Sequence, residues 1–535
     1  MITRIAVENF KGIGNAVEIP IRPITLLFGP NSAGKSTVMH AFHYAREVFE
    51  RHNLNADRTI AGGEFIDLGG FGNFVHDHRL DNVITLRFDM KLEPDRVDFP
   101  RYSPGELYIS IIDVPWQQPI ETASVEVKIA WNKDHNRPYV SRYAVGLNGK
   151  DIGWIECEKN AVVLRYFDIN HPVFQPPKKE GEEAEHSPIM MLFADALEGR
   201  EFGQGYMFDI VEQQDALPPC DRTLQVVLGR GEKKRPGFDP ESDHASEQRE
   251  LVGVLSQVFV GMAEVMRDEL RRFCYLGPLR EKPPREYMPP RFPDPSRWAT
   301  GLGAWDALST GDESLLIQVN LWMQAKEFLN TGYGVWRKAF LMLDPESALY
   351  TQLVTHSAFD EIEDLAAELH KMPERTQLIL QDERGLQLAI QDVGEGIAQV
   401  LPVVVAVLCP DASVVQVEQP ELHLHPTQQA ALGDLLIRGA LGKPSKPLIM
   451  ETHSEHLILR LLRRIRETTK IKETSAEGKK PFMGVPVTPA DVAILYARLK
   501  DGQTTFMQID VDQDGELVQP WPDDFFEQDF HERFA

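Results

Sequence analysis

The stretch Gly29-Pro30-Asn31-Ser32-Ala33-Gly34-Lys35-Ser36-Thr37 decides the fold of this chain of 535 residues. It fits the pattern GxxxxGK[ST] in full. A mostly apolar strand pattern, residues 24–28, precedes the motif, and a helical pattern over residues 38–49 follows it. Because this motif binds phosphate only between a strand and a helix, its context here predicts a phosphate-binding loop (P-loop).

Each residue type in the loop has a chemical reason. Glycines let main-chain N–H groups wrap around a phosphate, and the helix N-terminus adds a partial positive charge. Lys35 supplies a positive charge to the β- and γ-phosphates, and the Ser36 hydroxyl is a ligand for Mg²⁺. We therefore expect the following residues to bind the phosphates of a nucleotide: Asn31, Ser32, Ala33, Gly34, Lys35, Ser36 and Thr37.

A second motif, VVQVEQPELHLHP, covers residues 414–426. Its apolar strand residues end in Glu418, and a carboxylate at the C-terminal end of a strand binds Mg²⁺ in P-loop enzymes. A lone acid at a strand end is more often structural, but the P-loop requires such a partner. The sequence therefore predicts Ser36 and Glu418 as the magnesium ligands.

Two weaker patterns follow the same logic. Gly394 and Gly396 lie in the segment Asp392–Gln399, before an apolar helical run, and free N–H groups at a helix start form an anion site. An ordinary turn is the alternative, and Pro402 within the run is expected to kink a helix. His453 follows the strand pattern of residues 448–450 and is placed to reach a γ-phosphate, or else is a satisfied polar residue.

Composition excludes several classes of protein. A content of 42% hydrophobic and 26% charged residues is typical of globular proteins rather than disordered or fibrous ones. The longest nearly apolar run, residues 400–409, is about half the length that a membrane helix needs. The four cysteines form no CxxC pair, which favours a reducing, cytoplasmic location. A net charge of −25 argues against indiscriminate coating of nucleic acid.

The two ends of the chain have the patterns of two halves of one nucleotide-binding fold, separated by a long insertion. Short strands over about 83–168 are expected to extend the first half, followed by irregular loops over 170–250. Helical patterns cover about 251–273 and 313–343, and a hairpin over 378–390 turns at Arg384-Gly385. The expected segments are the P-loop half at 1–90, a β-rich insertion with irregular loops at 91–250, a helical insertion at 251–345, the second half at 346–460, and a tail at 461–535.

In this order, GPNSAGKST, VGEGIAQ, the apolar strand with EQPE, and THS resemble the ABC-type ATPases of the SMC, RecF and OLD branch. The motifs EQPELHLHP and ETHSEHL, and a Trp521-Pro522…Phe525-Phe526 element, are most similar to the stand-alone prokaryotic AAA-type ATPases. Residues 65–76 and 275–287 resemble that group as well. The resemblance implies an α/β, ABC-type (RecF/SMC-like) P-loop fold, split by a long β-strand and helical insertion, with a short α+β tail.

The same resemblance implies an ATPase that forms a head-to-head homodimer or higher oligomer. Lys35 and Ser36 of one subunit would bind ATP and Mg²⁺, and Gly394 and Gly396 of the other would cap the γ-phosphate. His453 would act as the switch histidine. Many members of the family stand beside a nuclease gene in anti-phage defence clusters, so a separately encoded nuclease or other effector is the expected partner.

Two residues depart from the family pattern. The signature serine is replaced by Gly394, and the residue after the magnesium-binding acid, usually a catalytic glutamate, is Gln419. An amide orients water but cannot accept its proton at neutral pH. Glu421, two residues on, is a substitute. We therefore expect slow hydrolysis, with Gln419, Glu421 and His453 as the catalytic residues.

Several alternatives stay open at this point. ATP could lock a structural scaffold or sensor with negligible hydrolysis, or the Asp510–Asp514 acids could belong to an OLD-like nuclease, although no acidic Gly-Glu element precedes them. A calcium loop there is disfavoured because its twelfth position is Trp521, so a hairpin turn is preferred. Zinc binding by residues 421–425 is a weak alternative. Two basic clusters, at 271–285 and 460–472, predict either nucleic-acid contacts or ion pairs with the many carboxylates.

Overall fold

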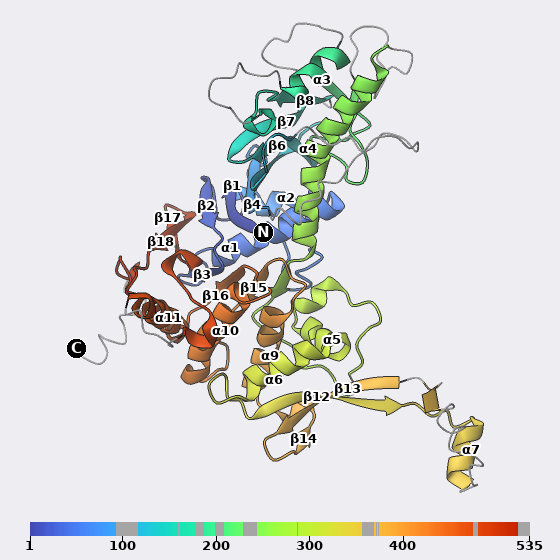
Figure 1. Ribbon diagram of the computed structural model, residues 1–535, viewed down its shortest axis with the longest axis vertical. Coiled ribbons are helices and arrows are strands. Elements are labelled where there is room, and N and C mark those ends of the chain that lie inside the picture. Colours follow the sequence, from blue (N-terminus) through green and yellow to red (C-terminus); the bar gives the residue numbers. More distant parts are fainter. Residues whose placement is uncertain are drawn as a thin grey trace.

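The computed structural model describes residues 1–92, 116–158, 161–176, 187–197, 208–227, 243–285, 287–355, 369–370, 372, 374–473 and 480–522. Its strands form a nine-stranded, a six-stranded and a three-stranded sheet. The six-stranded sheet lies in the middle of an elongated molecule, with the nine-stranded sheet towards one end and the three-stranded sheet towards the other (Figure 1). The predicted α/β class is confirmed.

The six-stranded sheet joins the two halves of the nucleotide-binding fold. Its order is β11-β15-β16-β3-β17-β18, and all neighbours are parallel except β17 and β18. Leu448 pairs with Ile24, so a strand of the second half lies directly beside the P-loop strand. The bounds are β11 (Cys274–Leu276), β15 (Val415–Glu418), β16 (Leu448–Glu451), β3 (Ile24–Phe28), β17 (Val492–Lys500) and β18 (Gln503–Ile509).

The strand β3 is buried along its whole length, as its mostly apolar sequence requires in a parallel sheet covered on both faces. The helix α1 (Lys35–Arg51) begins immediately after the P-loop. The helix α9 (Glu395–Leu408) packs on β11 and β15, and α10 (Pro426–Leu441) packs on β16, on β3 and on α11 (Glu455–Glu473). These helices cover the strands that carry the site.

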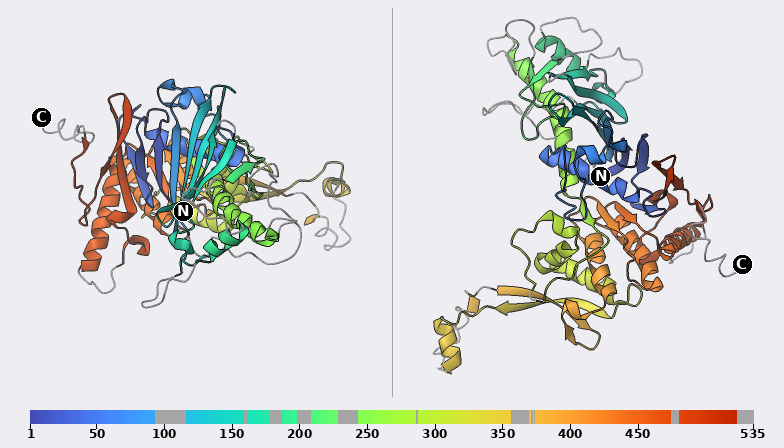
Figure 2. Two further views of the ribbon diagram at one scale, coloured as in Figure 1. Left: turned by 90° about the horizontal axis from the view of Figure 1, so that it is seen from above. Right: turned by 180° about the vertical axis from the view of Figure 1, so that it is seen from behind.

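The nine-stranded sheet is antiparallel and has the order β10-β9-β8-β7-β6-β5-β4-β1-β2. The predicted strands over 83–168 therefore extend the first half, as expected. The long helix α4 (Ala245–Arg271) runs along this sheet towards α1 (Figures 1 and 2). The bounds are β1 (Ile2–Glu8), β2 (Val17–Pro20), β4 (Ile84–Lys91), β5 (Thr122–Asn132), β6 (Arg137–Leu147), β7 (Lys150–Glu158), β8 (Ala161–Phe167), β9 (Phe208–Val211) and β10 (Gln225–Val227).

The region 170–250 is more regular than predicted in its described parts. The helix α3 (Pro188–Ala196) buries Ile189 and Phe193 against the core and contacts α4. The strands β9 and β10 close the edge of the large sheet. Pro, Gly and charge dominate the segment's composition, and this concealed the short apolar stretches that pack against α4.

The helical prediction for 313–343 is wrong in its second half. After α5 (Leu302–Thr310), the helix α6 (Glu313–Gln324) ends, and Gly332 with φ +76° turns the chain into the strand β12 (Tyr333–Leu341). This strand pairs along its length with β13 (Glu374–Asp382), and the ribbon extends from the body of the molecule (Figure 1). The helix α7 (Ala348–Thr355) lies at its far end.

The predicted hairpin at 378–390 is confirmed, with Gly385 at φ +84° between β13 and β14 (Gln387–Leu388). In the C-terminal region, the Trp521 ring lies edge-on to Phe28 at 5.7 Å between centroids, while residues 523–526 of the predicted aromatic element lie outside the described residues. Within the described ranges, none of the helices is long and apolar enough to cross a membrane.

Candidate nucleotide-binding site

The P-loop follows β3 and has an unusual backbone. Gly29, Ser32 and Gly34 have positive φ angles of +135°, +63° and +94°. A Cβ atom on Gly29 would lie 2.2 Å from the Ala497 carbonyl oxygen, so only glycine fits there. Successive N–H groups in such a backbone form a concave anion-binding nest.

A cavity of about 300 Å³ opens at this loop. Of the seven predicted P-loop residues, all but Ala33, which is buried, line it. The lining comprises Lys11, Asn31, Ser32, Gly34, Lys35, Ser36, Thr37, His40 and Glu451. The cavity is therefore where phosphates would be bound.

Lys35 is 4% exposed and is held by the loop itself. Its Nζ donates to the carbonyl oxygens of Gly29 at 3.0 Å and Pro30 at 2.9 Å. The same Nζ lies 3.5 Å from Oε1 of Glu451, and the Ser36 hydroxyl donates to Oε2 of Glu451 at 2.7 Å. The carboxylate in contact with Ser36 thus belongs to Glu451, whereas the sequence predicted Glu418.

Glu418 lies beside Glu451, because the two residues pair in register at the ends of β15 and β16. Burial and the neighbouring Glu451 raise the pKa of Glu418 to about 7. The Tyr275 hydroxyl donates to its Oε1 at 2.8 Å. Two adjacent carboxylates and a serine hydroxyl are the oxygen donors that Mg²⁺ prefers, and a cation would relieve the repulsion between them, so these residues fit a magnesium ion.

Glu421 connects the two loops that follow β15 and β16. Its Oε1 accepts a hydrogen bond from the main-chain N–H of His453 at 2.7 Å, and its Oε2 accepts one from the Thr452 hydroxyl at 2.8 Å. Burial, followed by the charge of Lys35, lowers the pKa of His453, so its imidazole is neutral at pH 7. Glu421 therefore positions the His453 segment, and both its oxygens already accept hydrogen bonds.

Gln419 has a left-handed backbone with φ +46°, and its N–H donates to the Glu451 carbonyl oxygen at 2.7 Å. Its carbonyl oxygen accepts a hydrogen bond from Arg280 at 3.2 Å. Burial lowers the pKa of Arg280 to about 10, so the guanidinium stays charged at pH 7. The main chain of Gln419 is thus fixed from both sides.

Sequence analysis did not identify three residues at the site. Glu451 carries the signal that identified Glu418, an acid at the end of an apolar strand, and could have been found in that way. Lys11 and His40 line the cavity with Lys11 Nζ 2.6 Å from His40 Nδ1, and burial lowers the pKa of Lys11 to about 8. No local motif marks this pair, because the fold alone brings residues 11 and 40 to the P-loop.

The signature segment, Asp392–Gln399, lies elsewhere. Gly394 is the N-cap of α9, and neither Gly394 nor Gly396 lines the P-loop cavity. A Cβ on Gly394 would meet nothing within 4 Å, whereas one on Gly396 would lie 2.7 Å from the His423 carbonyl oxygen. The expected kink does not end the helix, which continues through the buried Pro402 to Leu408.

The basic clusters are largely paired with carboxylates. Asp434 forms ion pairs with Arg460 and Arg464, and Arg466 forms one with Glu516. In the other cluster, Arg271 pairs with Glu50 and Arg272 with Glu269. The ion-pair explanation is therefore supported over a free basic surface.

The remaining weak motifs have structural roles. The His425 side chain accepts a hydrogen bond from the N–H of Thr427 and caps α10. In the acidic stretch after β18, Asp512 accepts hydrogen bonds from the N–H groups of Gly515 and Glu516, which closes a tight turn. The predicted hairpin turn is confirmed.

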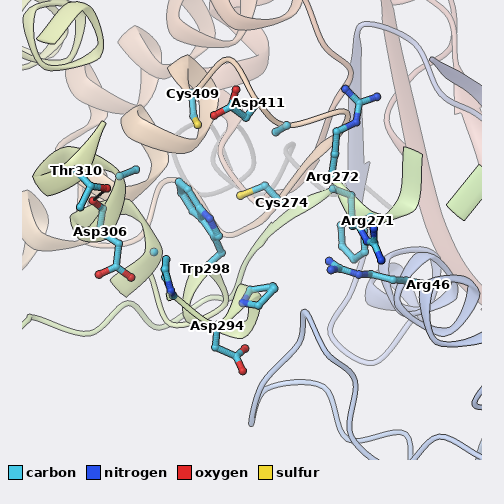
Figure 3. Close-up of a pocket in the computed structure, with 16 residues that line it drawn as sticks. Arg46, Arg271, Arg272, Cys274, Asp294, Trp298, Asp306, Thr310, Cys409 and Asp411 are labelled. Carbon is cyan, nitrogen blue, oxygen red and sulfur yellow. Dashed lines mark hydrogen bonds between the residues drawn. The ribbon is translucent and has the colours of Figure 1, made fainter. Parts of the chain in front are cut away.

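A larger cavity, of about 400 Å³, lies at the opposite ends of the strands, next to Cys274 at the start of β11 (Figure 3). Trp298 lies between one wall with Asp306 and another with the arginines Arg46, Arg271 and Arg272. Each of these arginines is paired with a glutamate. None of the predicted phosphate-binding residues reaches this cavity.

Family models match three parts of the chain. Residues 1–86 match "AAA ATPase domain", and residues 277–460 match "AAA domain, putative AbiEii toxin, Type IV TA system". Both stretches are similar to AAA-type ATPase domains. These domains cover β3 and the P-loop in one stretch, and β15, β16 and the signature segment in the other. Residues 487–532 match "Protein of unknown function (DUF3696)", and no curated protein matches the chain.

Three solved structures of Smc heads are similar to the chain at low identity. One, bound to the C-winged helix domain of ScpA, has 10% identity and a TM-score of 0.38 over 96% of this chain and 98% of its own. The SMC head domain from Thermotoga maritima has 8% identity and a TM-score of 0.35 over 95% of this chain and 99% of its own. The Smc head domain with an extended coiled coil derived from Pyrococcus furiosus has 10% identity and a TM-score of 0.37 over 95% of this chain and 96% of its own. These likenesses are too distant to support a conclusion about function.

Proposed function

We propose that the chain is a cytoplasmic ATPase that binds ATP with Mg²⁺, dimerises around it and hydrolyses it slowly to ADP and phosphate. The observation that carries this proposal is the contact between Ser36 and Glu451, which are 415 positions apart in the sequence. Together with Lys35 and Glu418 they form one oxygen-rich, partly buried site at a P-loop. The proposed biological role is control of a separately encoded effector, most plainly a nuclease, in anti-phage defence.

Each residue has a definite task in this proposal. Lys35 exchanges its contacts with the loop carbonyls of Gly29 and Pro30 for the β- and γ-phosphates, and the P-loop N–H groups bind the remaining oxygens. Ser36, Glu418 and Glu451 would hold Mg²⁺, which supplies Lewis-acid stabilisation of the phosphate charge. Gln419 orients the attacking water, and neutral His453 contacts the γ-phosphate.

A second subunit completes the site in this proposal. The signature glycines do not line the chain's own P-loop cavity, and the N-cap Gly394 has open space in front of it. An exposed helix N-terminus of this kind binds anions. This arrangement supports a homodimer in which each signature segment caps the phosphate bound by the other subunit.

Three measurements on the purified full chain test the proposal: binding of ATP with and without Mg²⁺, release of phosphate, and mass in solution with and without ATP. We expect ATP binding in the micromolar range that is common for enzymes, slow phosphate release, and a doubling of mass with ATP. A chain that binds no ATP would refute the function.

Gln419 favours a second candidate, an ATP-locked scaffold or sensor with negligible hydrolysis, because an amide cannot accept the proton of water. The two candidates share the site and the dimer. They differ in phosphate release, which would be absent from the scaffold. An OLD-like nuclease is a third candidate with less support, and plasmid nicking with Mn²⁺ or Mg²⁺ tests it directly.

Substitution by alanine is expected to have different effects at the two signature glycines, Gly394 and Gly396. Gly394→Ala has room in the subunit, so its melting temperature and ATP affinity should equal those of wild type, while the added methyl group weakens ATP-dependent dimerisation about fivefold or more. Gly396→Ala collides with the His423 carbonyl oxygen and should lower the melting temperature. Thermal denaturation and mass in solution separate the two effects. Unimpaired dimerisation of Gly394→Ala would contradict the capping role.

Tyr275 predicts a change in metal affinity. Tyr275→Phe removes the hydroxyl that donates to Glu418 and leaves the buried carboxylate less well oriented. Loss of such an outer contact typically lowers metal affinity about 10- to 100-fold. Titration of Mg²⁺ in the ATP-binding assay should show an Mg²⁺ affinity at least about 10-fold lower than that of wild type. ATP binding without the metal should stay unchanged. An unaltered Mg²⁺ requirement would show that Glu418 does not bind the ion.

A further inference from the structure

The side chain of Arg280 holds the chain at the point where β15 enters the phosphate site. It is 3% exposed, and its guanidinium donates to the carbonyl oxygens of Glu418 and Gln419. The rigid fork of a guanidinium suits two adjacent acceptors better than the single ammonium of lysine does. Arg280 therefore fixes the direction in which Gln419 leaves the sheet.

The main chain of Arg280 is held in turn by the signature helix. Its N–H donates to Oε1 of Gln399 at 3.2 Å, and its carbonyl oxygen accepts from Nε2 of the same side chain at 2.8 Å. Gln399 is buried in the second turn of α9. Because these two hydrogen bonds join the Arg280 main chain to Gln399, a movement of α9 would also move Arg280.

The next residues hold the start of the signature segment. Lys282 Nζ donates to the Val393 carbonyl oxygen at 3.0 Å and lies 2.7 Å from a carboxylate oxygen of Glu395. Arg285 forms a two-point ion pair with Asp392. The segment 280–285 therefore touches the signature on one side and the Gln419 main chain on the other.

We propose that Arg280 is a positioning residue that couples the signature segment of each subunit to the same subunit's own phosphate site. This inference rests on the proposed ATP-bound dimer. There, the signature of one subunit contacts the ATP of its partner, and the contact moves α9 and, through Gln399 and Lys282, the segment 280–285. Arg280 then sets Gln419 in the orientation that hydrolysis requires, so that the two ATP sites act together.

The test measures phosphate release by the full chain as a function of ATP concentration, together with ATP binding. Wild type should show a Hill coefficient above 1. Arg280→Lys keeps the charge but loses the two-carbonyl fork, so we expect kcat to fall roughly fivefold or more and the Hill coefficient to fall to 1. ATP affinity should stay within about twofold, since Arg280 does not line the P-loop cavity.

A second variant guards against misfolding, because Arg280 is buried. The Lys282 side chain is 20% exposed, and Lys282→Ala removes its two contacts with the signature, to Val393 and Glu395, without disturbing the interior. It should lose cooperativity in the same way. Arg384→Ala, in the exposed turn before β14, is the matched control and should behave as wild type. The double variant Arg280→Lys/Lys282→Ala should be no worse than Arg280→Lys, because both act on one path.

Wild-type kcat and Hill coefficient in both variants would overturn the coupling and leave the proposed function standing. A fall in melting temperature and ATP affinity with an unchanged Hill coefficient would overturn it too, because it would show a structural role alone. A wild-type chain that neither binds ATP nor dimerises would instead refute the proposed function itself.

Discussion

Lys35→Ala is expected to weaken ATP binding at least about 30-fold and to abolish ATP-dependent dimerisation. The ammonium is the charge closest to the phosphates in the proposed complex, and it is buried at the cavity. Truncating one partner of a buried charged contact costs about 2–5 kcal/mol, which corresponds to a roughly 30- to 5,000-fold loss of affinity. Isothermal titration with ATP and Mg²⁺ measures the loss, and mass in solution reports the dimer.

The matched control is Lys133→Ala, whose side chain is 73% exposed and pairs with Asp81 far from the P-loop in the sequence. It should bind ATP as wild type does. Lys35→Ala also leaves Glu451 without its cationic neighbour in the interior, so thermal denaturation must accompany the binding measurement. A folded Lys35→Ala protein that still dimerises with ATP would contradict the proposed site.

Gln419→Glu is expected to raise the rate of ATP hydrolysis by about 100-fold from a wild-type value below roughly 10 per second, since a positioned general base contributes 10²–10⁴-fold. The exchange of amide for carboxylate preserves shape, and the main chain is held by Glu451 and Arg280. The nearby carboxylates of Glu418 and Glu421 disfavour ionisation of a new acid, which raises its pKa towards the range that suits a base at pH 7. Phosphate release at saturating ATP is the measurement.

The reverse chemical exchange at the neighbouring residue is the control. Glu418→Gln should lower hydrolysis, because it removes a carboxylate from the proposed magnesium site. If Gln419→Glu and wild type release phosphate equally slowly, water is not activated from position 419, and the scaffold function gains support. If the wild-type protein already releases phosphate fast, the Gln419 amide does not limit the rate of hydrolysis.

The sequence predicts the parts of this protein that depend on local chemistry. The P-loop, its flanking β3 and α1, and the β15 and β16 strands follow from apolar runs and glycine positions. The helix predicted over 313–343 shows where this fails, because β12 is a strand only through its pairing with β13, whose sequence lies over thirty positions away. Tertiary pairing overrides local periodicity there.

The site follows the same division. Lys35, Ser36 and Glu418 come from motifs, and the structure brings them to one edge of a sheet. Two other contacts join residues that are more than one hundred positions apart: the hydrogen bond of Ser36 to Glu451 and that of Arg280 to the Gln419 carbonyl oxygen. No periodicity or spacing encodes such contacts, because they arise only when the parallel strands align in register.

The neighbours of β3 have a consequence for how this protein is made. On both sides the P-loop strand pairs with segments translated hundreds of residues later, β16 and β17, and Ala497 closes over Gly29. A nascent chain therefore leaves the ribosome with the edges of β3 unsatisfied for most of its synthesis. Nucleotide capture has to wait for the final strands, so a prematurely terminated product would be inert towards ATP and prone to aggregate.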